Sequence, residues 1–175
     1  MALKLYGAAL SPCTSRVMTC LHEKEADFEL VPVDIFAGEH KHLPFLAKNP
    51  FGQIPVLEDG DLSLFESRVI SAYVAEKFKE TGNDLIRHQS LKEAAEVKVW
   101  MEEDKLRRTK YLAGDFYSLA DLFHLSFTYY FMKTPCANMI NERPHVKAWW
   151  DDISSRPAFQ KVASDMNFGD NGIGN

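Results

Sequence analysis

The amino-acid sequence predicts an α/β domain with a small mixed sheet over the first eighty residues, followed by an all-helical domain. Strand and helix signals alternate through the first half, which ends in a hairpin signature and a helix. After the polar break Gly82-Asn83-Asp84, every periodic segment has helical spacing. The expected limits are 1–80 for the first domain, 81–89 for the linker and 90–175 for the helical domain. A tail that begins at about residue 167 is rich in Gly and Asn, and we expect it to fray.

The first half opens with a strand, Leu3-Lys4-Leu5-Tyr6, in which apolar and polar residues alternate before Gly7. Ser11-Pro12 is typical of a helix start, with Ser as the N-cap and Pro at the first helical position. A second strand is expected at 28–33. The sequence from 56 to 65 predicts a hairpin, because Asp59-Gly60 separates two short apolar runs.

The helix that follows the hairpin, called the third helix below, begins at Ser67, and its apolar residues recur at spacings of three and four. In the second half, residues 90–108 contain neither Gly nor Pro and favour one continuous helix of about 18 residues. Ser118 and Asp121 resemble a capping box at the start of a further helix. Arg143-Pro144 opens another helix, one face of which is apolar.

Composition excludes several classes of function. The 175 residues include 20 Lys and Arg against 25 Asp and Glu, so the net charge of −5 does not favour nucleic-acid binding. The 3 cysteines have no paired spacing, which argues against a disulfide framework. The start of the chain shows no signal peptide. The longest apolar stretch, 122–132, is too short to span a bilayer, so we expect a soluble, cytoplasmic protein.

Three features carry possible chemistry: the helix start at Ser11 and two short segments further along the chain. The Ser11 hydroxyl is either a simple N-cap or a hydrogen-bond donor to an anion such as a thiolate. The segment 49–57 contains Ile54-Pro55, which is either an ordinary trans bond or a cis bond that exposes the Ile54 backbone to an extended peptide. At the start of the third helix, Ser67 can hold a carboxylate and Glu66 an ammonium group. Together the three features describe a site for a small zwitterionic peptide that carries a thiol.

The chain resembles the glutathione transferases, most closely the plant phi class, over nearly its whole length. The matching stretches are 3–7 with Ser11, 39–41, 49–57, 59–61, 64–68, 111–115, 119–122 and 144–150. The resemblance implies a thioredoxin-like first domain with a four-stranded sheet, an all-α second domain and a homodimer. It also implies glutathione as co-substrate, small hydrophobic electrophiles as second substrates, and neither a cofactor nor a metal.

The resemblance also implies roles for individual residues. Ser11 is expected to stabilise the glutathione thiolate. The glycine end of glutathione would be contacted by His40 and Lys41. The remaining contacts would come from Gln53, the Ile54 backbone beside a cis Pro55, Glu66 and Ser67, the last two at the γ-glutamyl end.

The helical domain is shorter than the family pattern requires. Family members place two long antiparallel helices before the Tyr-Leu-Ala-Gly-Asp stretch, whereas only 91–110 fills that interval here. We therefore expect an open electrophile site, reduced activity and a weak dimer. Either the chain reverses between Met101 and Lys105, as the family path requires, or the later helices pack elsewhere, including on a second subunit. Helix propensity favours the continuous helix over this interval.

Three alternatives remain open at this level. The first is a largely non-catalytic protein that binds glutathione or a hydrophobic ligand. The second is thiol transfer through Cys13, in the first turn of its helix. The third concerns Phe123, Phe127 and Phe131, which either wall a ligand pocket or, as we favour, belong to the core.

Overall fold

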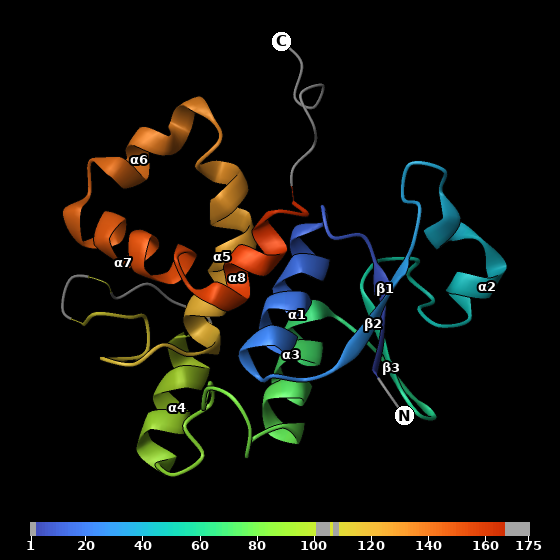
Figure 1. The fold of residues 1–175 in the computed structure, drawn as a ribbon, viewed down its shortest axis with the longest axis horizontal. Coiled ribbons are helices and arrows are strands. Elements are labelled where there is room, and N and C mark those ends of the chain that lie inside the picture. Colours follow the sequence, from blue (N-terminus) through green and yellow to red (C-terminus); the bar gives the residue numbers. More distant parts are fainter. Residues whose placement is uncertain (1–2, 101–105, 107–108, 167–175) are drawn as a thin grey trace.

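The computed structural model describes residues 3–100, 106 and 109–166 (Figure 1). Its sheet has the strand order β2-β1-β3-β4. The strands are β1 (Leu3–Gly7), β2 (Phe28–Pro32), β3 (Val56–Asp59) and β4 (Leu62–Phe65). β1 and β2 run parallel and are joined by α1 (Pro12–Glu23), whereas β3 pairs antiparallel with both β1 and β4. The predicted mixed sheet and the hairpin at Asp59-Gly60 are confirmed.

Helices cover both faces of this sheet (Figure 1). Because side chains alternate along a strand, Leu5 and Leu57 face α1 and α3 (Ser67–Lys77), whereas Tyr6 and Val56 face the other side. On that other side lie the short helix η1 (Glu39–Lys41) and α2 (Leu43–Leu46), whose Phe45 is buried. The N-terminal ends of α1 and α3, the η1 region and the loop before β3 line one cleft.

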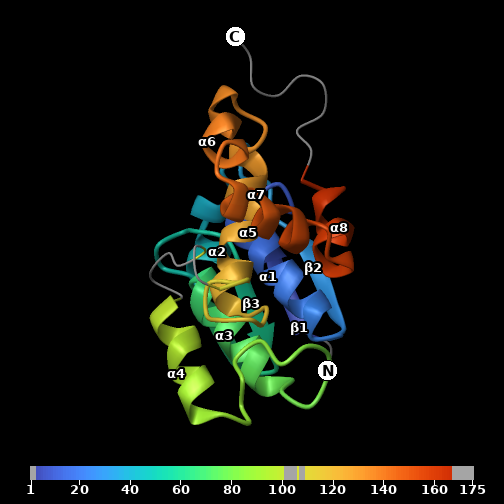
Figure 2. The ribbon, with the colours of Figure 1, turned by 90° about the vertical axis from the view of Figure 1, so that its left-hand side faces the viewer.

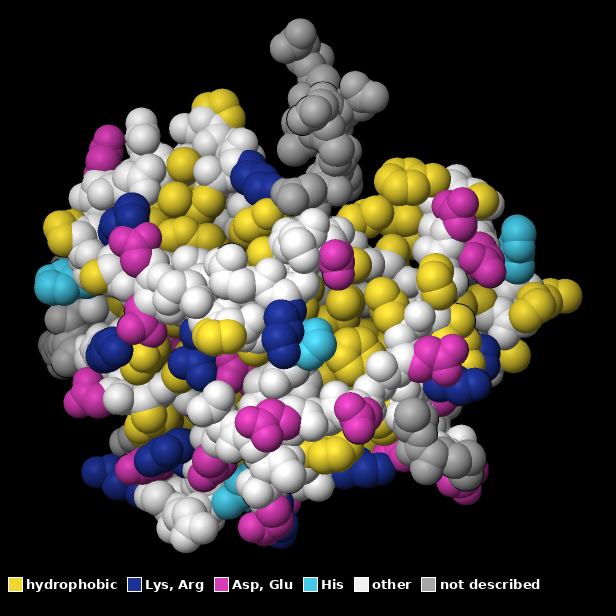
Figure 3. Space-filling model, viewed as in Figure 1, with side chains coloured by type: hydrophobic (Ala, Val, Ile, Leu, Met, Phe, Trp, Pro, Cys, Tyr) yellow, Lys and Arg dark blue, Asp and Glu magenta, His cyan; other side chains and the backbone are white. Residues whose placement is uncertain are grey.

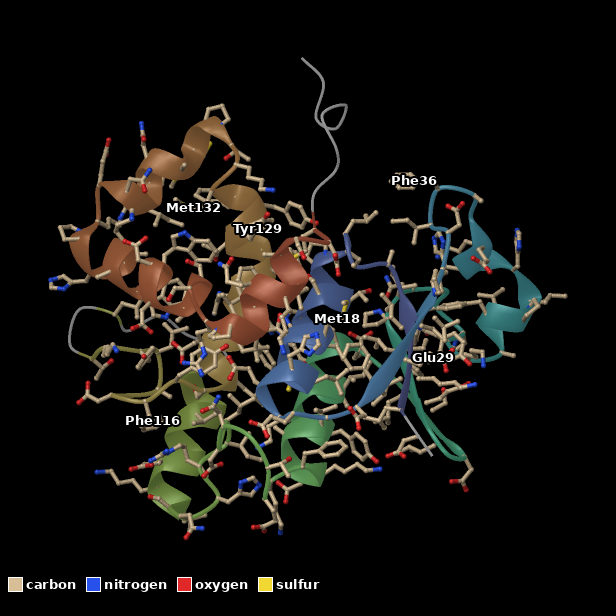
Figure 4. The ribbon with its side chains drawn as sticks, in the orientation of Figure 1. Met18, Glu29, Phe36, Phe116, Tyr129 and Met132 are labelled. Atoms are coloured by element: carbon tan, nitrogen blue, oxygen red, sulfur yellow. The ribbon has the colours of Figure 1, made fainter. Side chains whose placement is uncertain are left out.

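The second half of the chain is helical, and α1 lies between it and the sheet. Its elements are α4 (Leu91–Trp100), α5 (Leu119–Phe131), η2 (Pro135–Ala137), α6 (Asn138–Asn141), α7 (Pro144–Ser154) and α8 (Pro157–Ala163). Both α5 and α8 pack on α1, so residues 14–21 of α1 are buried on every side. Tyr129 of α5 points toward α8, where its ring lies 5.7 Å from that of Phe159 (Figure 4).

The predicted capping box of α5 is confirmed and forms a buried hub. Asp121 accepts hydrogen bonds from the Ser118 backbone at 3.0 Å and from Trp149 Nε1 at 2.9 Å. It also accepts one from the Leu112 backbone at 2.9 Å. The hub therefore fixes the chain before α5 and helix α7 to the same carboxylate.

The prediction of one continuous helix over 90–108 is wrong at its C-terminal end. α4 is described from Leu91 to Trp100, at one end of the molecule and opposite α6 (Figure 2), whereas Leu106 lies in a turn. Leu106 is buried, and the nearby Lys110 N–H donates to Asp115, so tertiary contacts override helix propensity here. The segment Met101 to Lys105, with its proposed reversal, lies outside the described residues, as does the tail from 167.

Two findings bear on the wider predictions. Within the described residues, no helix is both long enough and apolar enough to cross a membrane. The segment 81–89 contains no helix or strand, but it is not a loose tether, because Leu85 is fully buried and its carbonyl accepts from the Leu119 N–H at 3.1 Å. The division into 1–80, 81–89 and 90–175 stays a prediction.

Candidate functional site

A cleft of about 450 Å³ lies beside the N-terminal end of α1. All eight residues that the sequence selects line it, namely Ser11, His40, Lys41, Gln53, Ile54, Pro55, Glu66 and Ser67. The other lining residues are Cys13, Ile35, Asn49 and Gly52. These residues come from four segments that the fold brings to one place: the α1 start, the η1 region, the loop before β3 and the α3 start. The role of each stays a prediction.

Ser11 is the N-cap of α1, as predicted. Its Oγ accepts a hydrogen bond from the Thr14 N–H at 3.5 Å, which is long for such a bond. Because Oγ acts only as an acceptor in that bond, its proton stays available to a group in the cleft. The position also has the positive partial charge of a helix N-terminus, so it suits an anion.

The loop before β3 is organised by Asn49, which the sequence analysis did not select. Asn49 is buried; its Nδ2 donates to the Gln53 carbonyl at 2.8 Å, and its Oδ1 accepts from the Phe51 N–H at 3.0 Å. An Asn before Pro is a turn signal, so this role had a detectable trace in the sequence. The Ile54-Pro55 bond is cis, as predicted.

Gly52 joins this loop to the segment that carries His40 and Lys41. Its φ is +56°, and a Cβ here would lie 2.8 Å from the His40 carbonyl oxygen. The Lys41 Nζ donates to the Gly52 carbonyl at 2.7 Å, which completes the contact. Within the described part of the chain, the buried Nδ1 of His40 has no hydrogen-bond partner, so it is a candidate contact for a ligand.

The start of α3 forms the other side of the cleft. Glu66 has a φ of +71°, an unusual value for a non-glycine residue that costs about 1–3 kcal/mol and is typical of functional positions. Ser67 is buried as the first residue of α3, and its Oγ accepts from Arg16 Nη1 at 2.7 Å. Sequence reasoning found both residues but not the backbone conformation of Glu66.

Arg16 was missed by the sequence analysis, because it lies inside the apolar stretch of α1. Only 4% of its surface is exposed, and its Nε and Nη2 both donate to the Phe123 carbonyl, at 3.2 and 2.9 Å. Burial lowers the pKa of the guanidinium, while its interaction with Cys13 opposes that effect. An arginine remains protonated under such conditions, so a buried positive charge lies behind Ser67.

The three phenylalanines that recur every four residues in α5 differ in how deeply they are buried. Phe123 belongs to the core, as favoured, whereas Phe127 is 51% exposed and its ring centre lies 5.1 Å from Arg16 Cζ. The side chain of Phe131 is half-buried. Phe127 therefore presents an apolar surface close to the inner side of the cleft.

Two further observations concern the chemistry of the site. Cys13 is half-buried in the cleft lining, and the alternative of thiol transfer through Cys13 stays untested. On the face drawn in Figure 3, acidic, basic and hydrophobic side chains are intermixed. Among the described residues, no group of three or more His, Cys, Asp or Glu side chains is arranged to hold a metal ion.

Comparisons with known proteins point to one family. Residues 1–76 match the model of the glutathione S-transferase N-terminal domain, and residues 70–157 match that of the C-terminal domain. Glutathione S-transferase F13 of Arabidopsis thaliana is 48% identical, over 93% of this chain and 95% of the relative.

Solved structures agree with these matches. Glutathione transferase F7 from Populus trichocarpa is 60% identical with a TM-score of 0.93, over 95% of this chain and 100% of the other. Glutathione S-transferase I from maize, solved in complex with an atrazine glutathione conjugate, is 39% identical with a TM-score of 0.86. That match covers 95% of this chain and 98% of the maize chain.

The alignment with the Arabidopsis relative is longer than this chain. It runs over 209 positions, whereas this chain has 175 residues. At least 34 of the aligned positions (209 minus 175) therefore hold residues of the relative that have no counterpart in this chain.

Proposed function

The chain belongs to the glutathione S-transferase family, and its plant relatives are of the phi class. On this premise we propose that its cleft binds glutathione. We further propose that Ser11 activates the thiol for attack on small electrophiles. The observation that carries the proposal is the convergence of all eight selected residues on one cleft. The protein is thus a transferase that uses glutathione as co-substrate.

The proposed mechanism follows from the geometry of the cleft. The thiol of bound glutathione loses its proton to solvent. The Ser11 hydroxyl donates a hydrogen bond to the resulting thiolate, and the N-terminus of α1 further favours the thiolate over the thiol. The thiolate attacks the electrophilic carbon, forms the carbon–sulfur bond and displaces a leaving group such as chloride. The basic pair His40 and Lys41 suits the glycine carboxylate, while Glu66 and Ser67 suit the ammonium and carboxylate of the γ-glutamyl end.

We propose that the electrophile lies against Phe127, the exposed aromatic residue beside Arg16. Because this chain lacks residues present in the Arabidopsis relative, we expect this surface to be more open and turnover to be lower than in that relative. A more open surface holds the electrophile less precisely against the thiolate, and this alone is sufficient to lower turnover. The three cysteines form no disulfide among themselves, which supports our proposal of a cytoplasmic location.

Two assays on the same preparation test this function. We expect retention on immobilised glutathione, and conjugation of a chloro-dinitrobenzene at a rate above the uncatalysed background but below that of the Arabidopsis relative assayed in parallel. Retention without turnover would instead identify a binding protein. Absence of both would contradict the glutathione site, and a rate equal to that of the relative would contradict the consequence of the missing residues.

We also propose a weak homodimer that uses Phe51. Phe51 is 64% exposed on the loop before β3, and its ring lies edge-on to Phe65 at 5.8 Å. A rigid, exposed aromatic residue of this kind is typical of an interface anchor, whose truncation costs at least about 2 kcal/mol. Phe51→Ala should therefore raise the dimer dissociation constant by more than about tenfold in analytical ultracentrifugation.

The control for this variant is Leu43→Ala on α2, because Leu43 is even more exposed, at 82%, and we assign it no interface role. Its dissociation constant should match that of the wild type. A wild-type protein that stays monomeric at high micromolar concentration would contradict the dimer.

A further inference from the structure

Arg16 differs from Arg156, a less deeply buried arginine, in what surrounds it. Arg156, for comparison, is paired with the carboxylate of Glu23 at 2.6 Å. Arg16 is more deeply buried, yet no carboxylate of the described residues forms an ion pair with it. Its partners are the neutral Ser67 hydroxyl, the Phe123 carbonyl, the rings of Phe123 and Phe127 and the side chain of Cys13, none of which is a carboxylate. A buried charge normally has an opposite charge beside it, so a missing anion is indicated.

The bond from Arg16 to Ser67 determines what the Ser67 hydroxyl can do. A guanidinium only donates, so Ser67 Oγ must accept in this 2.7 Å bond, and its own proton must point elsewhere. Ser67 lines the cleft as the first residue of α3, where an anion is favoured by the helix N-terminus. The arginine thus leaves the serine as a donor toward the cleft.

We propose that Arg16 is a positioning residue for the γ-glutamyl end of glutathione: it orients Ser67 to donate to the α-carboxylate and supplies the buried positive charge that this carboxylate complements. This inference rests on the proposed function and adds a residue that does not line the cleft. It also assigns helix α5 a part in the glutathione site, because the Phe123 carbonyl holds the other two guanidinium donors.

A purely structural role makes a different prediction. If Arg16 only joins α1, α3 and α5, its removal lowers stability and weakens every ligand alike. If it positions Ser67, its removal affects ligands that carry the α-carboxylate and spares those without it. An analogue that replaces the γ-glutamyl residue by 4-aminobutyrate lacks only this carboxylate, so it separates the two roles.

The test measures dissociation constants for glutathione and for this analogue by calorimetry, on variants whose folding is checked by circular dichroism. Wild type should prefer glutathione. Arg16→Met should weaken glutathione binding by about tenfold, the loss of one charge-assisted hydrogen bond, and leave analogue binding nearly unchanged. In steady-state assays the loss should appear in KM rather than kcat. In a Ser67→Ala background, Arg16→Met should add much less than tenfold, because the two residues act as one unit.

Two further variants keep the inference falsifiable. Arg156→Met removes another partly buried arginine, and it should lower the melting temperature while leaving the preference for glutathione unchanged. Arg16→Lys keeps the charge but not the planar fork, so it should also reduce that preference, and it serves if Arg16→Met does not fold. A folded Arg16 variant with wild-type preference would overturn the inference. If the wild type itself did not bind glutathione, the proposed function would be wrong, and this outcome is distinct from failure of the inference about Arg16.

Discussion

Replacement of Ser11 by alanine is expected to lower the turnover of glutathione with an electrophile by about one to two orders of magnitude. The variant removes a hydrogen bond to an anion, worth about 1.5–3 kcal/mol, and this energy translates directly into rate. Glutathione binding should weaken far less, because the basic pair at one end of the cleft and Glu66 and Ser67 at the other are untouched. In the variant, the thiol of bound glutathione should ionise at a higher pH than in the wild type.

Ser90→Ala is a closely matched control. The Ser90 hydroxyl accepts from the Glu93 N–H at 3.3 Å, just as Ser11 accepts from Thr14 at 3.5 Å, but Ser90 lies before α4 and does not line the cleft. Both variants remove one helix-capping bond, so both should lose a similar, small amount of stability. Only Ser11→Ala should lose turnover in steady-state assays. Unchanged turnover in Ser11→Ala would refute the assignment and direct attention to Cys13.

Residues selected from local sequence signals and residues selected from the family resemblance line the same cleft. Ser11, Pro55 and Ser67 were found because a helix start and an X-Pro bond before a hairpin have recognisable local signals. His40 and Lys41 were found only through the family resemblance. Local signals depend on neighbours in sequence, so they remain visible without a structure. Arg16 gives no local signal, because its partners, Ser67 and Phe123, are distant in sequence.

Two other features could not be predicted from the sequence, because they depend on the tertiary structure. Glu66 adopts a positive φ although its residue type disfavours it, because the surrounding fold determines the backbone there. Phe123 and Phe127 occupy equivalent positions on the helical repeat, yet only Phe123 is buried. Periodicity predicts that they share a face of α5, but burial depends on what packs on each turn. The helical conformation predicted for Leu106 was wrong for the same reason, since propensity ignores the burial of that residue.

The break at Gly82 was interpreted from sequence as a linker, and the structure makes it a tight junction. Gly82 has a φ of +56°, and a Cβ there would lie 2.1 Å from the Glu23 carbonyl oxygen at the end of α1. Two hydrogen bonds cross the same region: the Asn83 N–H donates to the Glu23 carbonyl at 3.0 Å, and Lys24 Nζ donates to the Asn83 carbonyl at 2.7 Å. The Glu23 side chain in turn pairs with Arg156, which joins this junction to the start of α8.

Gly82→Ala is therefore expected to destabilise the protein by about 3 kcal/mol or more. A left-handed backbone costs an L-residue about 1–2 kcal/mol, and an overpacked contact adds about 1–3 kcal/mol. The contact here is with backbone atoms, so no side-chain rotation relieves it. For a chain of this size, the thermal midpoint should fall by about 6–12 °C, as followed by circular dichroism.

Gly60 provides the control that separates the two costs. Its φ of +64° is close to that of Gly82, but nothing lies within 4 Å of a Cβ placed there. Gly60→Ala should therefore show only the conformational cost, about 1–2 kcal/mol. Asparagine tolerates this backbone region, so Gly60→Asn should be close to wild type, while Gly82→Asn should remain strongly destabilised by the clash with Glu23. Equal midpoints for the Gly82 and Gly60 variants would show that the junction at the end of α1 is looser than its contacts imply.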